Sequence, residues 1–114
     1  AIPANHIEDE NLRVSIYRKI ASASLAEEVR ELYGEIRDRF GPIPAPLDRL
    51  LKIARLRIAA AAKNLQSIEV RDDKVMMMRS NDYLMTNGRF PRLRGTAATP
   101  RLEELIRIVT DWQD

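Results

Sequence analysis

A rigid elbow near the middle of the chain is the strongest constraint on its fold. The stretch DRFGPIPAP, residues 38–46, contains three prolines and one glycine in nine residues. Gly41 suits the left-handed position that follows many helices, and Pro42 then prevents a helix from continuing. Pro46 suits the first turn of a new helix, where its missing N–H costs nothing. The stretch therefore predicts a stiff connection between two helices.

Apolar spacing predicts the helices on both sides of this elbow. The helix before it runs from Ser24 to Phe40, and its first letters, SLAE, predict a capping box between Ser24 and Glu27. The helix after it runs from Pro46 to about Lys63, with Asn64 as a left-handed cap. An earlier helix is predicted from about Glu10 to Ala21. The buried face of the middle helix is predicted to contain Leu25, Val29, Leu32, Ile36 and Phe40.

The apolar period changes from helix to strand after residue 65. SIEVR and KVMMMR predict one hairpin around Asp72-Asp73, and DYLM and RFPRL predict a second around Asn87-Gly88, with Pro91 at an edge or bulge. A final helix, TPRLEELIRIVTDW, is predicted with Thr99 as its N-cap and Pro100 in its first position. The fold class is therefore α+β, with three N-terminal helices, a small antiparallel sheet and a C-terminal helix.

Composition constrains the number of domains, the class of partner and the compartment. Its 114 residues suit a single domain, residues 1–114, and its 45% apolar and 32% charged residues are typical of a globular protein. The net charge is only +2, so no overall polycation drives binding to nucleic acid. The absence of cysteine, of a signal-peptide core and of a membrane-length apolar run favours a cytoplasmic protein with no membrane partner. Because the sequence does not begin with Met, we expect a fragment of a longer chain.

No pattern in the sequence indicates catalysis, a cofactor or a metal site. His6 is the single histidine, and the four glycines form no phosphate-binding loop. Asp72-Asp73 is better explained as a turn than as a cation site. In a strand, Met76 and Met78 face one side and Met77 the other, which favours core packing over a soft metal or an adaptable binding surface. We therefore predict a non-enzymatic domain.

Two charged surfaces remain as candidate binding sites. Acidic residues spaced by three or four positions lie on one side of the helix before the elbow, either as an ordinary solvated face or as a docking face for a partner's arginines. They are Glu27, Glu31, Glu35 and Asp38. The alternative is a nucleic-acid-binding module that uses arginines of the strand half, near Tyr83 and Phe90. Those arginines are Arg79, Arg89, Arg92 and Arg94.

Two stretches resemble a known family. IEDENLRVSIYRKIASA (residues 7–23) and ELYGEIRDRFGPIPAPLDRLLKIARLR (residues 31–57) are similar to the C-terminal domain of bacterial transcription-repair coupling factor (Mfd). The resemblance covers about the first 65 residues, and its most specific part is the DRFGPxP elbow. The strand half matches only loosely. Asn64 stands where the family commonly has Gly, and both residues accept the left-handed cap.

The resemblance implies a regulatory role. Proteins of that family are multidomain DNA translocases that displace stalled RNA polymerase and recruit the repair protein UvrA, and their ATPase motor, polymerase contacts and DNA contacts belong to other domains. The C-terminal domain is non-catalytic, packs on the N-terminal UvrB-like module of the same protein, and masks its UvrA-binding surface. The family's acidic contact residues fall here on Glu35 and Asp38, with Glu27 and Glu31 at the periphery of the contact.

Overall fold

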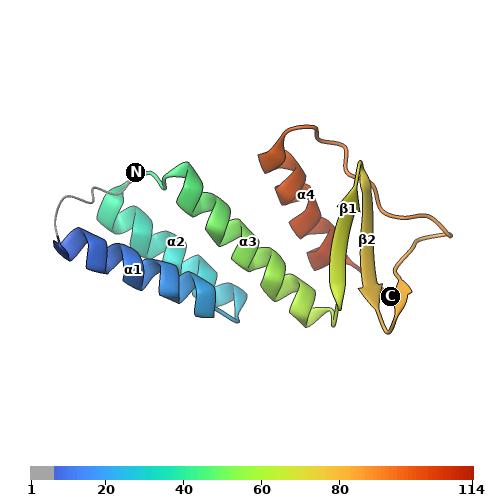
Figure 1. Cartoon of the computed structure of the whole chain (residues 1–114), viewed down its shortest axis with the longest axis horizontal. Coiled ribbons are helices and arrows are strands. Elements are labelled where there is room, and N and C mark those ends of the chain that lie inside the picture. Colours follow the sequence, from blue (N-terminus) through green and yellow to red (C-terminus); the bar gives the residue numbers. More distant parts are fainter. Residues whose placement is uncertain (1–6) are drawn as a thin grey trace. The chain divides into compact units, whose positions relative to one another are not determined.

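The computed structural model describes the backbone of residues 7–114 and the side chains from residue 10 onward, so His6 lies outside the described residues. The predicted α+β class is confirmed (Figure 1). The chain divides into two compact units, and the boundary falls between Ile58 and Ala59. That the two units act as one domain stays a prediction. The elements are α1 (Ile7–Ser22), α2 (Ala26–Phe40), α3 (Ala45–Ala62), β1 (Ser67–Arg71), β2 (Lys74–Arg79), β3 (Asp82–Tyr83) and α4 (Ala98–Asp111).

The first unit is built from helices packed around an aliphatic core. Figure 1 shows α1 and α2 side by side, as expected for helices joined by a connection of only a few residues. Leu25 was predicted in this core but is 61% exposed, because α2 begins only at Ala26 and leaves Leu25 in extended backbone before the first turn. The buried core residues are Ile16, Ile20, Ala23, Val29, Leu32, Ile36, Leu47, Leu51 and Ala54.

Polar contacts join α3 to the other two helices of this unit. Arg57 donates through Nη2 to the carbonyl oxygens of Ile20 and Ala23, at 3.0 and 2.9 Å. These oxygens lie at the C-terminal end of α1, where carbonyls lack helical partners and a cation is favoured. The Tyr33 hydroxyl of α2 donates to Asp48 Oδ1 of α3 at 3.3 Å. Burial raises the pKa of Tyr33 above its ordinary value, and the Asp48 carboxylate raises it further.

The start of α2 differs from the predicted capping box. The backbone N–H groups of Ser24 and Leu25 both donate to Glu28 Oε1 at 3.1 Å. Glu27 instead pairs with Arg30 at 2.6 Å. The prediction was wrong by one residue because the helix starts after Leu25, which makes Glu28 the acid in the third helical position.

The elbow is formed largely as predicted. Gly41 has φ of 78° and donates its N–H to the Arg37 carbonyl oxygen at 2.8 Å. Its ψ of −140° lies outside the predicted left-handed region, since a residue before proline is driven toward extended ψ values. Pro46 lies in the first turn of α3, as predicted. Asn64, just beyond the end of α3, has φ of 58°, which confirms the left-handed cap.

The second unit contains an antiparallel sheet in the order β1-β2-β3. The first predicted hairpin is confirmed, with Asp72 at φ of 55° in its turn. The second is reduced to a single bridge between Thr86 and Arg89. The RFPRL segment instead returns to the edge of β2, where Lys74 pairs with Arg92, because β3 covers only the far end of that edge. The edge position predicted for Pro91 is confirmed, since its carbonyl oxygen accepts a hydrogen bond from β2.

Helix α4, one face of the sheet and the segment between β3 and α4 supply the buried residues of the second unit. The predicted cap at Thr99 was wrong, because α4 begins at Ala98 and the extended residue before it is Ala97. The approach to α4 is fixed by Glu104, whose two carboxylate oxygens accept the backbone N–H groups of Arg94 and Gly95 at 2.7 Å. The buried residues are Val75, Met77, Leu93, Leu105, Ile106 and Val109.

Candidate functional site

The four predicted acidic residues lie on one side of α2, and we call them the acidic face: Glu27, Glu31, Glu35 and Asp38. Steps of three and four residues place side chains above one another on a helix. Three of the four are exposed, whereas the Glu35 side chain is 30% exposed and lies nearest the packed side of the helix. The structure therefore confirms the shared face, and it gives Glu35 a different environment from the rest.

The members of the acidic face differ in their ionic partners. Lys19 of α1 places its Nζ 3.3 and 3.5 Å from the two carboxylate oxygens of Glu35, and Arg39 Nε lies 4.0 Å from Oε1 of the same residue. Among residues 10–114, no cation pairs with Asp38 or Glu31. Asp38 is thus an open carboxylate one turn away from a carboxylate that already has partners.

A hollow of about 260 Å³ lies between α1 and α2 beside the acidic face. Three carboxylates and one ammonium group surround it, so its lining is anionic overall. Glu28 is already bound to the start of α2, whereas Glu31 is open. The hollow has room for the end of a cationic side chain next to Glu31 and Glu35. It is lined by Lys19, Ser22, Glu28, Glu31, Leu32 and Glu35.

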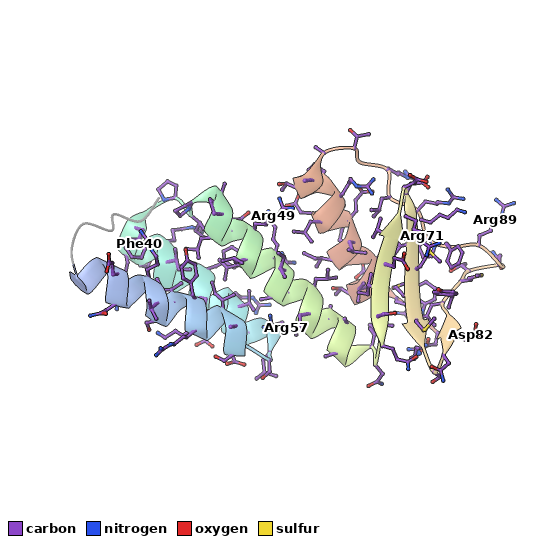
Figure 2. All side chains as sticks on the ribbon, in the orientation of Figure 1. Phe40, Arg49, Arg57, Arg71, Asp82 and Arg89 are labelled. Carbon is purple, nitrogen blue, oxygen red and sulfur yellow. The ribbon has the colours of Figure 1, made fainter. Side chains whose placement is uncertain are left out.

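The four arginines of the alternative site do not act alike. Arg79 donates to the Lys63 carbonyl oxygen at 3.1 Å and pairs with Asp114, and this pair lowers the pKa of the Asp114 carboxyl. Arg92 pairs with Asp73 at 2.6 Å. The side chains of Arg89 and Arg94 are exposed and have no ionic partner among the described residues; Figure 2 shows Arg89 at the tip of the segment after β3. Two of the four, Arg79 and Arg92, are therefore engaged within the fold.

The sequence pattern of the TRCF domain matches residues 1–87. The chain belongs to the TRCF domain family. Transcription-repair-coupling factor of Escherichia coli K12 is 43% identical over 68 residues, which are 60% of this chain and 6% of that protein. The proteins of the same name from Mycobacterium bovis and Rickettsia prowazekii are 34% and 31% identical over 67 and 72 residues. The chain matches only 5–6% of the length of these relatives.

We also searched the described part of this TRCF domain for metal sites and membrane-spanning helices. No group of three or more His, Cys, Asp or Glu residues there could hold a metal ion. Asp72 and Asp73 form the hairpin turn, and Asp73 is paired with Arg92. None of the described helices is both long and apolar enough to cross a membrane.

Among the residues of this site that the sequence analysis did not predict, Lys19 is the one that pairs with Glu35 from another helix. It lies 16 residues before Glu35 and belongs to a different helix. The short connection predicts that α1 and α2 are antiparallel neighbours, but it does not fix the rotation of each helix about its axis. The available signal was an exposed cation in the last turn of α1, three residues after the buried Ile16 and therefore at the edge of the packed side of that helix.

Proposed function

We propose that this TRCF domain is a non-catalytic regulatory part of a transcription-repair coupling factor. In this proposal it docks on the N-terminal UvrB-like module of the same protein and masks the surface that binds UvrA. DNA translocation, ATP hydrolysis and contact with RNA polymerase belong to other parts of the protein. Membership of the TRCF domain family supports the assignment to a transcription-repair coupling factor. The resemblance around the elbow supports the docking role.

The observation that carries the proposal is the open carboxylate of Asp38 beside Glu35. Together they present two acceptors one helical turn apart, which suits charge-assisted hydrogen bonds from the arginines of a partner. The helix that carries them is held on one side by the core and ends at the proline elbow. The backbone of this helix therefore loses little conformational entropy when a partner binds, and the surface is preorganised for docking.

The contact must be weak enough to open. A switch responds to another ligand only if the docking free energy is comparable to the coupling that the ligand can supply, which is about 1–3 kcal/mol for typical allosteric proteins. Exposed ion pairs contribute about 0.2–1 kcal/mol each. A contact built on two such carboxylates falls in the range that a competing partner can reverse.

The test is a calorimetric titration of the 114-residue chain with the isolated UvrB-like module, carried out at low and at high salt. We expect binding by the wild type and loss of binding in Glu35→Lys/Asp38→Lys. The control is Asp82→Lys/Asp111→Lys, which changes the net charge equally at exposed positions of the second unit. Circular dichroism shows whether each variant is folded. Equal binding by the wild type and the folded acidic-face variant would place the contact elsewhere.

A further inference from the structure

The second unit has a sheet face that does not carry its core. Alternation along β2 buries Val75 and Met77 on one side and leaves Met76 and Met78 half-buried on the other. Tyr83 lies opposite Met78, and the ring of Phe90 contacts that of Tyr83 at 5.5 Å, so both aromatic rings belong to this second side. We call Met76, Met78, Tyr83 and Phe90 the methionine face.

One end of the methionine face carries a row of three cations. Arg71 lies opposite Lys74 across the hairpin, and Lys74 lies opposite Arg92 across the next bridge, so the three side chains point to the same side of the sheet. All three are exposed. Lys74 is two residues from Met76 on β2, which places the row beside the methionine face, and Glu69 lies opposite Met76 at this border. Figure 2 shows Arg71 at the turn end of the sheet and Asp82 toward the opposite end.

The charge of this row is only partly balanced by the fold. Glu69 pairs with Arg71 and Asp73 pairs with Arg92, each at 2.6 Å. Lys74, in the middle of the row, pairs with no carboxylate among residues 10–114. An ammonium group flanked by two guanidinium groups attracts an external anion placed beside the apolar patch.

We propose that the methionine face docks an amphipathic helix of a protein partner, with glutamate or aspartate side chains at the end that meets Lys74. Methionine side chains are flexible and polarizable, so they adapt to the apolar stripe of a helix. A single-stranded nucleic acid fits less well. The two aromatic rings meet edge to face at 79°, which leaves no stacked platform, and two of the three cations already have carboxylate partners.

The chain contains its own reference for testing this surface. It has four methionines, and Met77 is fully buried on the opposite side of the sheet from Met76 and Met78. Labelling the methionine methyl groups with ¹³C therefore gives NMR signals for two methionines of the proposed surface and one of the core. The probe is a synthetic amphipathic helix with leucines on one face and glutamates at one end. A matched peptide has lysines in place of the glutamates.

We expect the acidic peptide to move the Met76 and Met78 signals and to leave the Met77 signal unchanged. Lys74→Glu should weaken this binding by about fivefold, since it replaces one exposed attraction by a repulsion. Arg107→Glu makes the same charge change on α4 and should have no effect. The proposal is overturned if the lysine peptide binds equally well, if no signal moves, or if single-stranded oligothymidine moves the same two signals more strongly. Because the acidic face is not involved, Glu35→Lys/Asp38→Lys should bind the peptide like the wild type.

Discussion

Lys19 already occupies part of the surface that we assign to docking. Its Nζ lies 3.3 Å from Glu35 Oε1, with the two side chains 52% and 30% exposed. A cationic partner that approaches Glu35 must displace this ammonium group or share the carboxylate with it. Lys19 also repels incoming cations, because it stays beside the acidic face after displacement. We therefore expect Lys19→Gln to strengthen docking while it slightly destabilises the isolated chain.

The size of the Lys19 effect follows from the exposure of the pair. Exposed ion pairs contribute about 0.2–1 kcal/mol, and the half-buried Glu35 places this pair in the upper part of that range. Converted to affinity, 1 kcal/mol is about a fivefold change in Kd. We expect Lys19→Gln to tighten binding of the UvrB-like module by about two- to fivefold and to lower the free energy of unfolding by no more than about 1 kcal/mol.

The assay is calorimetric titration of the UvrB-like module with each variant at one low salt concentration. Arg18→Gln is the matched control, because it removes the same charge from the neighbouring exposed position of α1 and Arg18 forms no ion pair with the acidic face. We expect it to change affinity less than Lys19→Gln does. Weaker binding by Lys19→Gln than by the wild type would refute the reasoning, since it would make Lys19 part of the docking surface instead of a competitor.

Three further predictions concern stability. Leu51→Ala empties a fully buried site in the helical core and should lower the free energy of unfolding by about 2–5 kcal/mol in urea denaturation. Arg57→Met removes two hydrogen bonds to the end of α1 and should cost about 1–3 kcal/mol by the same method, whereas Arg55→Met, on the same helix, should cost less. Two backbone N–H donors, from Arg94 and Gly95, lower the pKa of Glu104 below its ordinary value of 4.5. The ionised Glu104 therefore contributes stability above that value, and this contribution is lost as the pH falls through the lowered pKa. The difference in melting temperature between Glu104→Gln and the wild type should shrink on acidification. A difference that stays constant with pH would contradict this.

Local chemistry made much of the fold predictable. Gly41 and Asn64 mark the helix ends through positive φ values that glycine and asparagine tolerate, and the proline at the start of α3 needs no N–H partner. The helix starts were less predictable. Ser24 is followed by glutamates at both 27 and 28, and the capping-box spacing fits either, depending on whether Ser24 or Leu25 precedes the helix.

Long-range pairing was the part that sequence could not supply. The RFPRL segment matched a hairpin with DYLM, but the longer edge of β2 competes for the same backbone groups, and the outcome depends on the packing of Leu93 into the core. The same holds for the site. Helical spacing was sufficient to gather the acidic face on one side of α2, whereas the contact of Lys19 with Glu35 depends on how two helices are rotated against each other.

The most direct test of the proposed function is UvrA binding by the full-length protein that carries this domain. If the acidic face holds the domain over the UvrA-binding surface, Glu35→Lys/Asp38→Lys should expose that surface and increase the affinity for UvrA. The control variant Asp82→Lys/Asp111→Lys should bind UvrA like the wild type. Unchanged UvrA binding by a folded acidic-face variant would contradict the proposal that these two carboxylates keep the surface masked.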